Sequence, residues 1–555
     1  MPIPKNSSPY TTPQDVAVSG ATAPNGKPYI CVTSSGQTAW LPRSAFTGSG
    51  SEALKILNAA NIPLLTSEWA QCKTKVAALT SYPFKTLIDR PGWNGEHFAL
   101  PDGTVFSPRT TDEAVVLFPV NEQKCATAGS IYAWRMTTSL LKNQSVATFV
   151  LLAAYAGPFL ALTNQIMNQG FEIAGPRGVG KSTVQRFAAA VCGPADNPLG
   201  LNYWVTADAT INALERIMAD HADMPLIMDE FNLYAAGENV AARARKFNEL
   251  VFKLSNGSEK MRFGASNPQR SRFVFIASTN EPLEQLLLGH QLAGAEAAFD
   301  RLLTIPIGSD RPFGVFDSVP AKFATSGQFA DQLNLATRKC YGIGIRHLLK
   351  CLVADLAKDP TDIAQKLKKS ISYFRKQVGV DLNNGSETRV ADAFGLVYAA
   401  GKFALRYKAI SKHLNPLEAT LACYRLNQTA RSKPQDPVAQ LLKLADDFYT
   451  LDVTFDTIRD ISDEDIEEAC GIVRMARGGQ RELLLTDSQL KRVIINTRAF
   501  FADPQIDRML ISENGRKQTK RRIRKKHKAE RFYCFRLPPE TTVQNSRQAA
   551  AGAGG

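Results

Sequence analysis

One stretch decides the fold of this chain: Gly175-Pro176-Arg177-Gly178-Val179-Gly180-Lys181-Ser182-Thr183, which fits the pattern G-x-x-x-x-G-K-S. Apolar residues precede it and a helical apolar spacing follows it, so a strand leads into the loop and a helix leaves it. Glycines let backbone N–H groups face a phosphate, and the helix amino end adds positive charge. We expect ATP here, with Lys181 on the β- and γ-phosphates and Ser182 on Mg²⁺. The alternative is a glycine-rich turn with an exposed lysine.

Two later apolar runs end in polar residues that suit the same site. The first ends in Asp229-Glu230, 48 residues after Lys181. There Asp229 would hold Mg²⁺, and Glu230 would orient and deprotonate the attacking water. The second ends in Ser278-Thr279-Asn280, where the Asn280 amide would contact the γ-phosphate and the water. The alternatives are solvated acids after a buried strand, and a turn cap at the asparagine.

Two arginines are further candidates. Arg301 lies 21 residues after Asn280 and directly before a short apolar run. An arginine that stabilises the transferred phosphate is often supplied by a neighbouring subunit, so we predict that Arg301 acts in trans. A surface salt bridge is the alternative. Arg389 opens an amphipathic helical pattern over 390–405 and is a candidate second sensor of the nucleotide. Its alternative is an ordinary arginine at a helix start.

A basic segment lies between the two apolar runs, over residues 256–272. It has turn residues in its middle and cations on both arms, which predicts a hairpin inserted before the third strand. Its cations would grip a phosphate backbone and its phenylalanine could stack on a base. The predicted DNA-binding residues are Lys260, Arg262, Phe263, Arg270 and Arg272. A solvated basic loop is the alternative.

Composition limits the class of protein. The 555 residues predict three or four domains, and 44% apolar with 21% charged residues suits a soluble globular chain. The formal net charge of +14 favours nucleic acid or an anionic surface as partner. Nine scattered cysteines without a C-x-x-C pair indicate neither a zinc site nor disulfides, so we expect a cytoplasmic protein. The apolar run 146–162 is short and broken by Gly157-Pro158, which favours a buried helix over a membrane span.

The pattern along the chain predicts its organisation. We expect an α/β P-loop core with a helical lid, an N-terminal α+β domain and a winged-helix-like basic C-terminal domain. One helix, Ser51–Ala60, is expected among the N-terminal strands, and Pro101-Asp102-Gly103 predicts a hairpin turn. The predicted parts are a disordered 1–28, an α+β domain 29–119, a helical connector 120–170, the core 171–320, the lid 321–433, the basic domain 438–539 and a flexible tail 540–555.

The C-terminal region combines two features that suggest DNA binding. Residues 516–528 hold nine Lys or Arg and no acid, and an alternating strand pattern follows at 531–537. Helices followed by a basic hairpin are typical of a winged helix, with the basic run beside DNA. The predicted contacts are Lys520, Arg521, Arg522, Arg524, Lys525 and Lys526. The acidic run 462–465 resembles a helix start more than a metal site.

The motif order resembles an AAA+ ATPase, and a narrower pattern resembles the cassette-chromosome helicase family of prophages and mobile elements, long known only as a domain of unknown function. The resemblance covers roughly residues 30–410. Its residues are Trp93 in GWNGEHFALPDG, Trp204-x-Thr206, Asn212-Ala-Leu-Glu215, His221-Ala-Asp223, Asp229-Glu230, Leu254-Ser-Asn-Gly257 with Lys260 and Arg262, and Gly314-Val-Phe-Asp317. Ser-Thr-Asn-Glu-Pro at 278–282 departs from the family's Ser-Thr-Gly-Glu.

The resemblance implies a hexameric ring with ATP and Mg²⁺ between subunits and DNA in its pore. The expected function is an ATP-dependent DNA helicase or translocase, with single-stranded DNA in the pore and duplex or origin DNA on the C-terminal domain. One alternative is an ATPase switch that recruits a replication or defence partner without unwinding DNA. Another is a basic DNA-binding module with a degenerate nucleotide site, against which the intact Lys181, Asp229 and Glu230 argue. No paired-carboxylate motif for primase chemistry is found in residues 30–120.

Overall fold

The computed structural model places most of the chain. The described residues are 16–109, 113–163, 167–196, 202–207, 211–231, 234, 240–258, 270–280, 282–283, 295–308, 311–431, 437–445, 450–453, 466, 469, 471–476, 479–493, 500–501, 503–513, 515–523 and 529–538. They form two compact units, one of Met1–Leu283 with Gly294–Asn427 and one of Glu284–Ala293 with Gln428–Gly555. Each unit is described by itself.

The first unit begins with a small antiparallel sheet covered by helices. Its strands are β1 (Ala17–Thr22), β2 (Pro28–Ser34) and β3 (Gln37–Pro42), followed by η1 (Arg43–Phe46), α1 (Ser51–Ala59) and α2 (Thr66–Ala77). The disorder predicted up to residue 28 is wrong from residue 17 on, because β1 pairs along its whole length with β2. The predicted first helix is confirmed, but α2 was missed. Its signals were the Glu68 side chain, which accepts the Leu65 N–H at 2.8 Å, and an apolar face at Trp69, Cys72 and Val76.

Short strands connect this sheet to the core. They are β4 (Leu87–Ile88), β5 (Gly92–Asn94), β6 (His97–Ala99), β7 (Val105–Phe106) and β8 (Val115–Val116). The predicted hairpin is confirmed, since β6 and β7 pair antiparallel across Pro101-Asp102-Gly103. Trp93 and Phe98 are buried and meet edge to face with ring centroids 4.9 Å apart. Both are therefore core residues.

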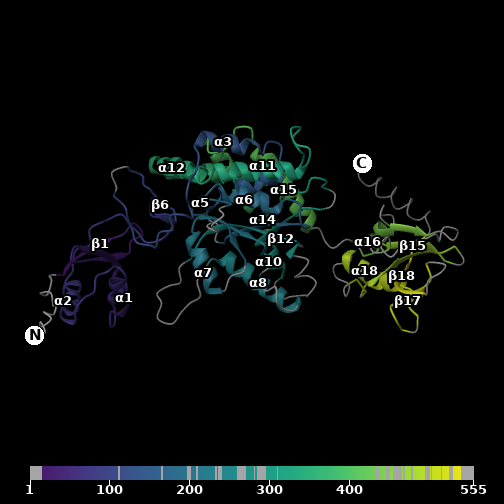
Figure 1. Cartoon of the computed structure of the whole chain (residues 1–555), viewed down its shortest axis with the longest axis horizontal. Helices are drawn as coiled ribbons and strands as arrows, with labels where there is room; N and C mark the ends of the chain where they lie inside the picture. The colour runs from purple at the N-terminus through teal and green to yellow at the C-terminus, as the bar shows by residue number, and fades with distance from the viewer. Residues whose placement is uncertain are drawn as a thin grey trace, which may run out of the picture. The chain divides into compact units, whose positions relative to one another are not determined.

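A five-stranded parallel sheet forms the centre of the first unit (Figure 1). Its order is β10 (Val205–Thr206), β11 (Met224–Asp229), β12 (Phe273–Thr279), β9 (Gln169–Ala174) and β13 (Leu302–Pro306). Strands β9, β11 and β12 are buried at every residue, which explains the continuous apolar runs in β11 and β12. Parallel strands put their carboxyl ends at one edge, so the loop after β9 and the polar ends of β11 and β12 come together.

Helices cover both faces of this sheet. In Figure 1, α6 (Lys181–Ala189) and α14 (Gly385–Arg406) lie on one side of β12, and α7 (Ile211–Asp220) and α8 (Val240–Asn256) lie on the other. The apolar run 146–162 is buried, as predicted, but it folds as two helices instead of one, and Gly157-Pro158 begin the second. No helix among the described residues is long and apolar enough to cross a membrane. The described helices between residues 131 and 299 are α3 (Ile131–Ser139), α4 (Ser145–Ala153), α5 (Gly157–Leu160), α6 (Lys181–Ala189), α7 (Ile211–Asp220), α8 (Val240–Asn256) and α10 (Ala295–Phe299).

The predicted helical lid is α11 (Ser326–Lys339), α12 (Ile343–Lys358), α13 (Pro360–Val378), α14 (Gly385–Arg406) and α15 (Pro416–Arg431). It does not have a separate core. Phe394 of α14 packs against Phe149 of α4 and against Phe171 of β9, with ring centroids 5.3 Å apart in each pair. From Val390 to Ala404 α14 is buried on nearly every side, so it is a central helix and not the amphipathic one expected.

The second unit corrects the predicted winged helix. Its sheet has five strands in the order β14 (Thr450–Val453), β15 (Gly471–Met475), β16 (Arg481–Leu485), β18 (Glu530–Arg536) and β17 (Gln518–Arg521), with β14 parallel to β15. This is larger than a small wing, and apolar clusters lie on both of its faces. The predicted strand at 531–537 and its basic hairpin partner are present as β18 and β17. The described helices are α16 (Pro437–Ala445), α18 (Asp487–Val493) and α20 (Pro504–Met509). The acidic run 462–465 lies outside the described residues.

Candidate nucleotide-binding site

The phosphate loop lies between β9 and α6 at the carboxyl edge of the sheet. Gly178 and Gly180 have φ angles of 83° and 91°, a region in which a side chain is strained. The loop is braced from both sides: Gly175 N donates to Thr279 O at 3.2 Å, and Val315 N donates to Val179 O at 2.9 Å. Its backbone shape is therefore fixed by strand β12 and by the segment after β13.

Lys181 is buried at the mouth of this loop, with 8% of its surface exposed. Its ammonium donates to Gly175 O at 2.6 Å, to Pro176 O at 2.7 Å and to Asn280 Oδ1 at 3.3 Å. Burial lowers the pKa of Lys181, whereas nearby Asp229 raises it and Arg177 lowers it further. Two of these acceptors are carbonyls of the loop and the third is the side chain that follows β12, so a phosphate could replace them without a change of fold.

The Asp229 carboxylate, at the end of β11, accepts hydrogen bonds from two hydroxyl groups and one backbone N–H. Its Oδ1 accepts from Ser278 Oγ at 2.7 Å, from Glu230 N at 3.0 Å and from Ser182 Oγ at 3.2 Å. Two cis ligands of an octahedral Mg²⁺, each about 2.1 Å from the ion, are about 3 Å apart. The spacing of the Ser182 and Asp229 oxygens therefore fits one Mg²⁺, whose other ligands would be phosphate and water. The serine at 278 was not given a role from the sequence, although its position after an apolar run was a signal.

Glu230 leaves the strand in a left-handed conformation, with φ 51°, and its side chain is exposed. A residue other than glycine in this region costs about 1–3 kcal/mol, and such strain clusters at functional sites. The Glu230 N–H is held by Asp229 Oδ1 and by Ser278 Oγ at 3.3 Å. The turn thus places an exposed carboxylate beside the loop, where a general base is needed.

Arg301 lies at the opposite edge of the sheet from the phosphate loop. Its carbonyl accepts from Gly170 N at 2.9 Å, at the amino end of β9. Since β9 has six residues and a strand rises about 3.3 Å per residue, the two edges are about 20 Å apart. The guanidinium stacks 4.5 Å from the Phe252 ring centre and donates to Ala297 O. Arg301 therefore cannot serve the loop of its own chain.

Arg389, the candidate second sensor, lies with Arg301 and not with the phosphate loop of its own chain. Its guanidinium is 3.5 Å from Asp300 Oδ2, and Ser386 Oγ donates to Asp300 Oδ1 at 2.6 Å. Burial lowers the pKa of Arg301, and the nearby positive charge of Arg389 lowers it further. Two arginines with one carboxylate between them thus form a cationic cluster at the amino edge.

The basic segment 256–272 is closed at its base. Ser258 and Arg270 form an antiparallel bridge, and Ser271 N donates to Gly257 O at 2.9 Å. Asn168, missed in the sequence, anchors this base: its Nδ2 donates to Ser271 O and Leu254 O, and its Oδ1 accepts from Phe273 N. The base is at the same edge as Arg301. Lys260, Arg262 and Phe263 lie outside the described residues.

Arg272 is a structural cation, which corrects its assignment to DNA. Its Nε donates to Asp223 Oδ1 at 2.9 Å, and Asp223 is 1% exposed. The other oxygen of Asp223 accepts from Trp93 N at 3.0 Å. Arg272 thus compensates a buried carboxylate that also holds the N-terminal part of the unit. Arg270 is half-buried at the bridge, and burial lowers its pKa.

The predicted cations of the second unit divide between two faces of the β17–β18 hairpin. Arg521 is 13% exposed, donates to Glu513 at 2.9 Å and lies 3.5 Å from Glu482, so its assignment to DNA is corrected. Lys520 is exposed and lies directly opposite exposed Arg531. Like charges in that position destabilise a sheet. Arg522 is exposed just after β17, and Arg524, Lys525 and Lys526 lie outside the described residues.

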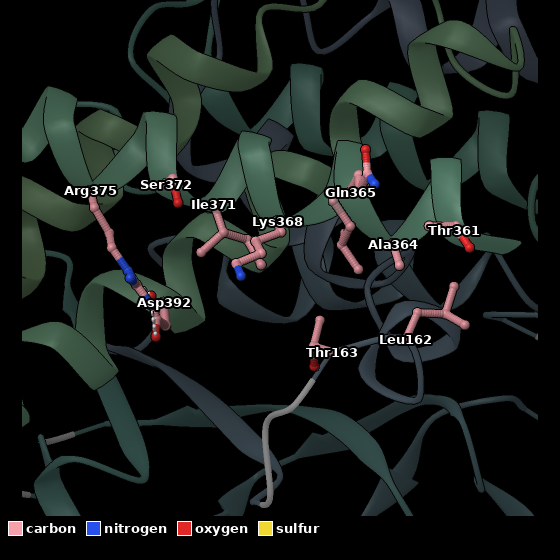
Figure 2. A pocket seen from close by; sticks show the side chains of 11 residues that line it. Leu162, Thr163, Thr361, Ala364, Gln365, Lys368, Ile371, Ser372, Arg375 and Asp392 are labelled. Atoms are coloured by element: carbon pink, nitrogen blue, oxygen red, sulfur yellow. Dashed lines mark hydrogen bonds and ion pairs between the residues drawn. The ribbon is translucent and has the colours of Figure 1, made fainter.

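A hollow of about 430 Å³ lies between α13 and the chain after α5 and shares no residue with the phosphate loop. Figure 2 shows α13 presenting Gln365, Lys368 and Ile371 above Leu162 and Thr163. At one end the Arg375 guanidinium pairs with Asp392 of α14. The hollow is therefore not part of the candidate nucleotide site, which consists of the phosphate loop and the strand ends beside it.

Comparisons with known proteins concern the family and the fold of the chain. Residues 32–272 match the family described as "Domain of unknown function (DUF927)". The fold is similar to the solved structure titled "SCCmec type IV Cch - active helicase", with a TM-score of 0.51, 13% identity, 97% of this chain and 96% of that chain covered. The resemblance to the cassette-chromosome helicase family is confirmed. At 13% identity, the likeness to this helicase concerns the fold.

Two weaker likenesses to solved structures have TM-scores too low to carry an argument. The NrS-1 C-terminal region has a TM-score of 0.25 at 10% identity and covers 70% of this chain and 87% of that chain. NtrX from Brucella abortus in complex with ATP has a TM-score of 0.18 at 16% identity and covers 44% of this chain and 66% of that chain. No curated protein matches the chain.

Proposed function

We propose that the chain is an AAA+ ATPase that unwinds or moves along DNA, as a homo-hexameric replicative helicase of a prophage or mobile element. One observation carries the proposal. Lys181, Ser182 and Asp229 converge at one edge of the parallel sheet, while Arg301 lies at the other edge, about 20 Å away. A site divided in this way needs a second subunit to complete it.

Each described residue of the site has a role in this proposal. Ser182 and Asp229 would hold Mg²⁺, which would neutralise charge on the phosphates. Lys181 would exchange its loop carbonyls for phosphate oxygens, and Glu230 would take a proton from the attacking water. Asn280, already 3.3 Å from the Lys181 ammonium, would orient that water or the γ-phosphate.

The neighbouring subunit would receive the cationic cluster at the amino edge. Arg389 pairs with Asp300, the residue before Arg301, and its charge acts on Arg301, so both arginines would approach the same nucleotide of the next subunit. A planar guanidinium matches a phosphate with two parallel hydrogen bonds. The closed base of the segment 256–272 lies at this edge too, so its cations would reach single-stranded DNA in the pore.

The proposal is tested by strand displacement on a forked DNA with ATP and Mg²⁺. The wild-type chain should unwind the fork, while Glu230→Gln should bind ATP but lose hydrolysis and unwinding. A wild type that hydrolyses ATP but neither unwinds nor moves on DNA contradicts the helicase. That outcome favours the switch that recruits a partner, and DNA-independent hydrolysis without DNA binding would support it further.

A further inference from the structure

The phosphate-loop strand carries a buried carboxyl group that none of the roles above uses. Glu172, in the middle of β9, is 0% exposed. Its Oε1 accepts from Thr279 Oγ1 at 2.7 Å and from Leu283 N at 2.9 Å, and its Oε2 accepts from Thr304 Oγ1 at 2.6 Å. No cation among the described residues forms an ion pair with it. The group is therefore held by three donors, from the two neighbouring strands and the turn that follows β12.

A buried carboxyl without a counter-charge is unfavourable unless hydrogen bonds compensate it. Burial raises the pKa of Glu172, while the donors from Thr304, Thr279 and Leu283 oppose that shift. The Leu283 N–H cannot rotate away, so Oε1 must remain an acceptor. A glutamine could keep an acceptor at this position by turning its NH₂ toward the Thr304 hydroxyl, which can accept as well as donate. A leucine would remove both acceptors and leave the Leu283 N–H without its partner.

The donors identify what the carboxyl positions. Thr279 directly precedes Asn280 and Leu283 follows it by three residues, so both ends of the turn that carries Asn280 are tied to one oxygen. That oxygen belongs to β9, which ends at Ala174, directly before the phosphate loop. Asn280 meets Lys181 across this junction at 3.3 Å. Through these hydrogen bonds, Glu172 sets the distance between the Asn280 turn and the phosphate loop.

The third donor links the same carboxyl to β13, the strand that starts directly after Arg301. Thr304 lies opposite Glu172 in the register of β9 and β13, and Asn427 Nδ2 donates to the Thr304 carbonyl at 2.9 Å. This contact is on the far side of β9 from Asn280. It offers a matched control, because its loss removes a hydroxyl from the same carboxyl without touching the turn.

We propose that Glu172 is a positioning residue for ATP hydrolysis, holding the Asn280 turn at a set distance from Lys181. The inference rests on the proposed ATPase function and deepens it. Glu172 should affect kcat and not the affinity for ATP, because it makes no contact with Lys181, Ser182 or Asp229 in the phosphate site. A merely structural role would instead lower stability and leave the activity of the folded fraction unchanged.

The test compares Thr279→Val with Thr304→Val in the full-length chain, each of which removes one hydroxyl donated to Glu172. Thr279→Val and Glu172→Leu should lower kcat about 10- to 100-fold, the usual effect of a small misplacement, with KM for ATP changed less than about threefold. Thr304→Val should keep kcat within about threefold. Equal kcat losses in the two threonine variants, or a loss confined to KM, overturn the proposal.

A second measurement keeps this test separate from the proposed function. Amide hydrogen exchange at Leu283 should be faster in Glu172→Leu and Thr279→Val and unchanged in Thr304→Val, whether or not ATP is turned over. If the wild type hydrolyses no ATP, the proposed function fails while exchange still reports the positioning. If Leu283 exchanges at the wild-type rate in Glu172→Leu, the positioning inference fails on its own.

Discussion

At the scale of single residues, buried polar side chains hold the ends of the strands in place. Asp229, Glu172 and Asn168 each satisfy three backbone or hydroxyl donors and acceptors around β9, β11 and β12. Such groups are stable in a core only when they are fully bonded. They fix the ends of the strands, and the strand ends carry the predicted catalytic side chains.

His221 gives a pH prediction at this scale. It is 0% exposed, its Nδ1 lies 2.6 Å from the Ile217 carbonyl oxygen, and its ring packs edge to face on Tyr203. Burial, with Lys124 nearby, lowers the pKa of His221 to about 3. The folded state therefore favours the neutral ring, so this stability is present above the unfolded pKa of about 6.5 and is lost as pH falls from there toward 3.

Denaturant unfolding should report this loss as about 2 kcal/mol between pH 7 and pH 5, at about 1.4 kcal/mol per pH unit. In His221→Gln the difference between the two pH values should shrink by about that amount, even if the variant is less stable throughout. An unchanged difference would show that another group titrates instead. His413→Gln, which removes a histidine at an exposed position, is the matched control.

At the scale of elements, close packing between strands limits substitution. Gly170 of β9 lies against the Phe275 ring of β12, and a Cβ there would meet that ring closer than real contacts allow. Its φ is not in the left-handed region, so the reason is space and not backbone conformation. The sequence pattern alone could not distinguish this glycine from a weak strand position.

We predict that Gly170→Ala destabilises the first unit by about 1–3 kcal/mol, the usual effect of overpacking. The control is Gly385→Ala at the start of α14, where a Cβ meets nothing within 4 Å. That change should be neutral or stabilise by up to about 1 kcal/mol. Thermal unfolding of both variants checks the pair, and equal effects would contradict the packing argument.

The β17–β18 hairpin gives a second prediction for an element. Exposed Lys520 and Arg531 lie opposite each other on one face, while Arg521 is neutralised on the other. If the exposed pair contacts phosphates, Lys520→Ala with Arg531→Ala should weaken duplex binding for all sequences. The slope of log K against log salt should fall by about 2, since each phosphate contact contributes about 0.9.

The control for this prediction removes two exposed lysines of the first unit, Lys350→Ala with Lys369→Ala, which gives the same change in net charge. Binding is measured without nucleotide, so hydrolysis does not enter. A control that loses as much salt dependence as the hairpin variant would show that total charge, and not this face, governs binding.

At the scale of the whole molecule, the proposed active site is incomplete in one chain. The phosphate loop and Arg301 lie at opposite edges of the same sheet, so no motion within the fold brings them together. The hollow beside α13 does not alter this, because it shares no residue with the loop. Assembly should therefore decide activity, and the two edges can be tested separately.

We predict that Lys181→Ala and Arg301→Ala are each inactive alone but regain ATPase activity when mixed with subunit exchange. In a random 1:1 ring, about one quarter of the subunit junctions pair an intact Lys181 with an intact Arg301, so about that share of activity should return. Size-exclusion chromatography should show that both variants assemble. No recovery in mixed rings would place Arg301 outside the neighbour's site.

The sequence by itself determined the parallel-sheet core, the phosphate loop and the polar strand ends, because each is written in a local pattern. Glycine spacing, continuous apolar runs and the acids that end them require no distant partner to be recognised. The same locality explains the hairpin at residues 97–106, whose turn residues are Pro, Asp and Gly.

Only the tertiary structure decided which charged residues are neutralised by a partner. Arg272 and Arg521 look like any basic residue in sequence, but Asp223 and the pair Glu482 and Glu513 neutralise them from distant positions. Arg389 pairs with Asp300, at the edge of the sheet opposite the phosphate loop. The C-terminal sheet has more strands than predicted because segments that are distant in sequence pair with one another. A local sequence pattern determines whether a segment forms a helix or a strand. Ion pairs and the place of a strand in its sheet depend instead on contacts between segments that are distant in sequence.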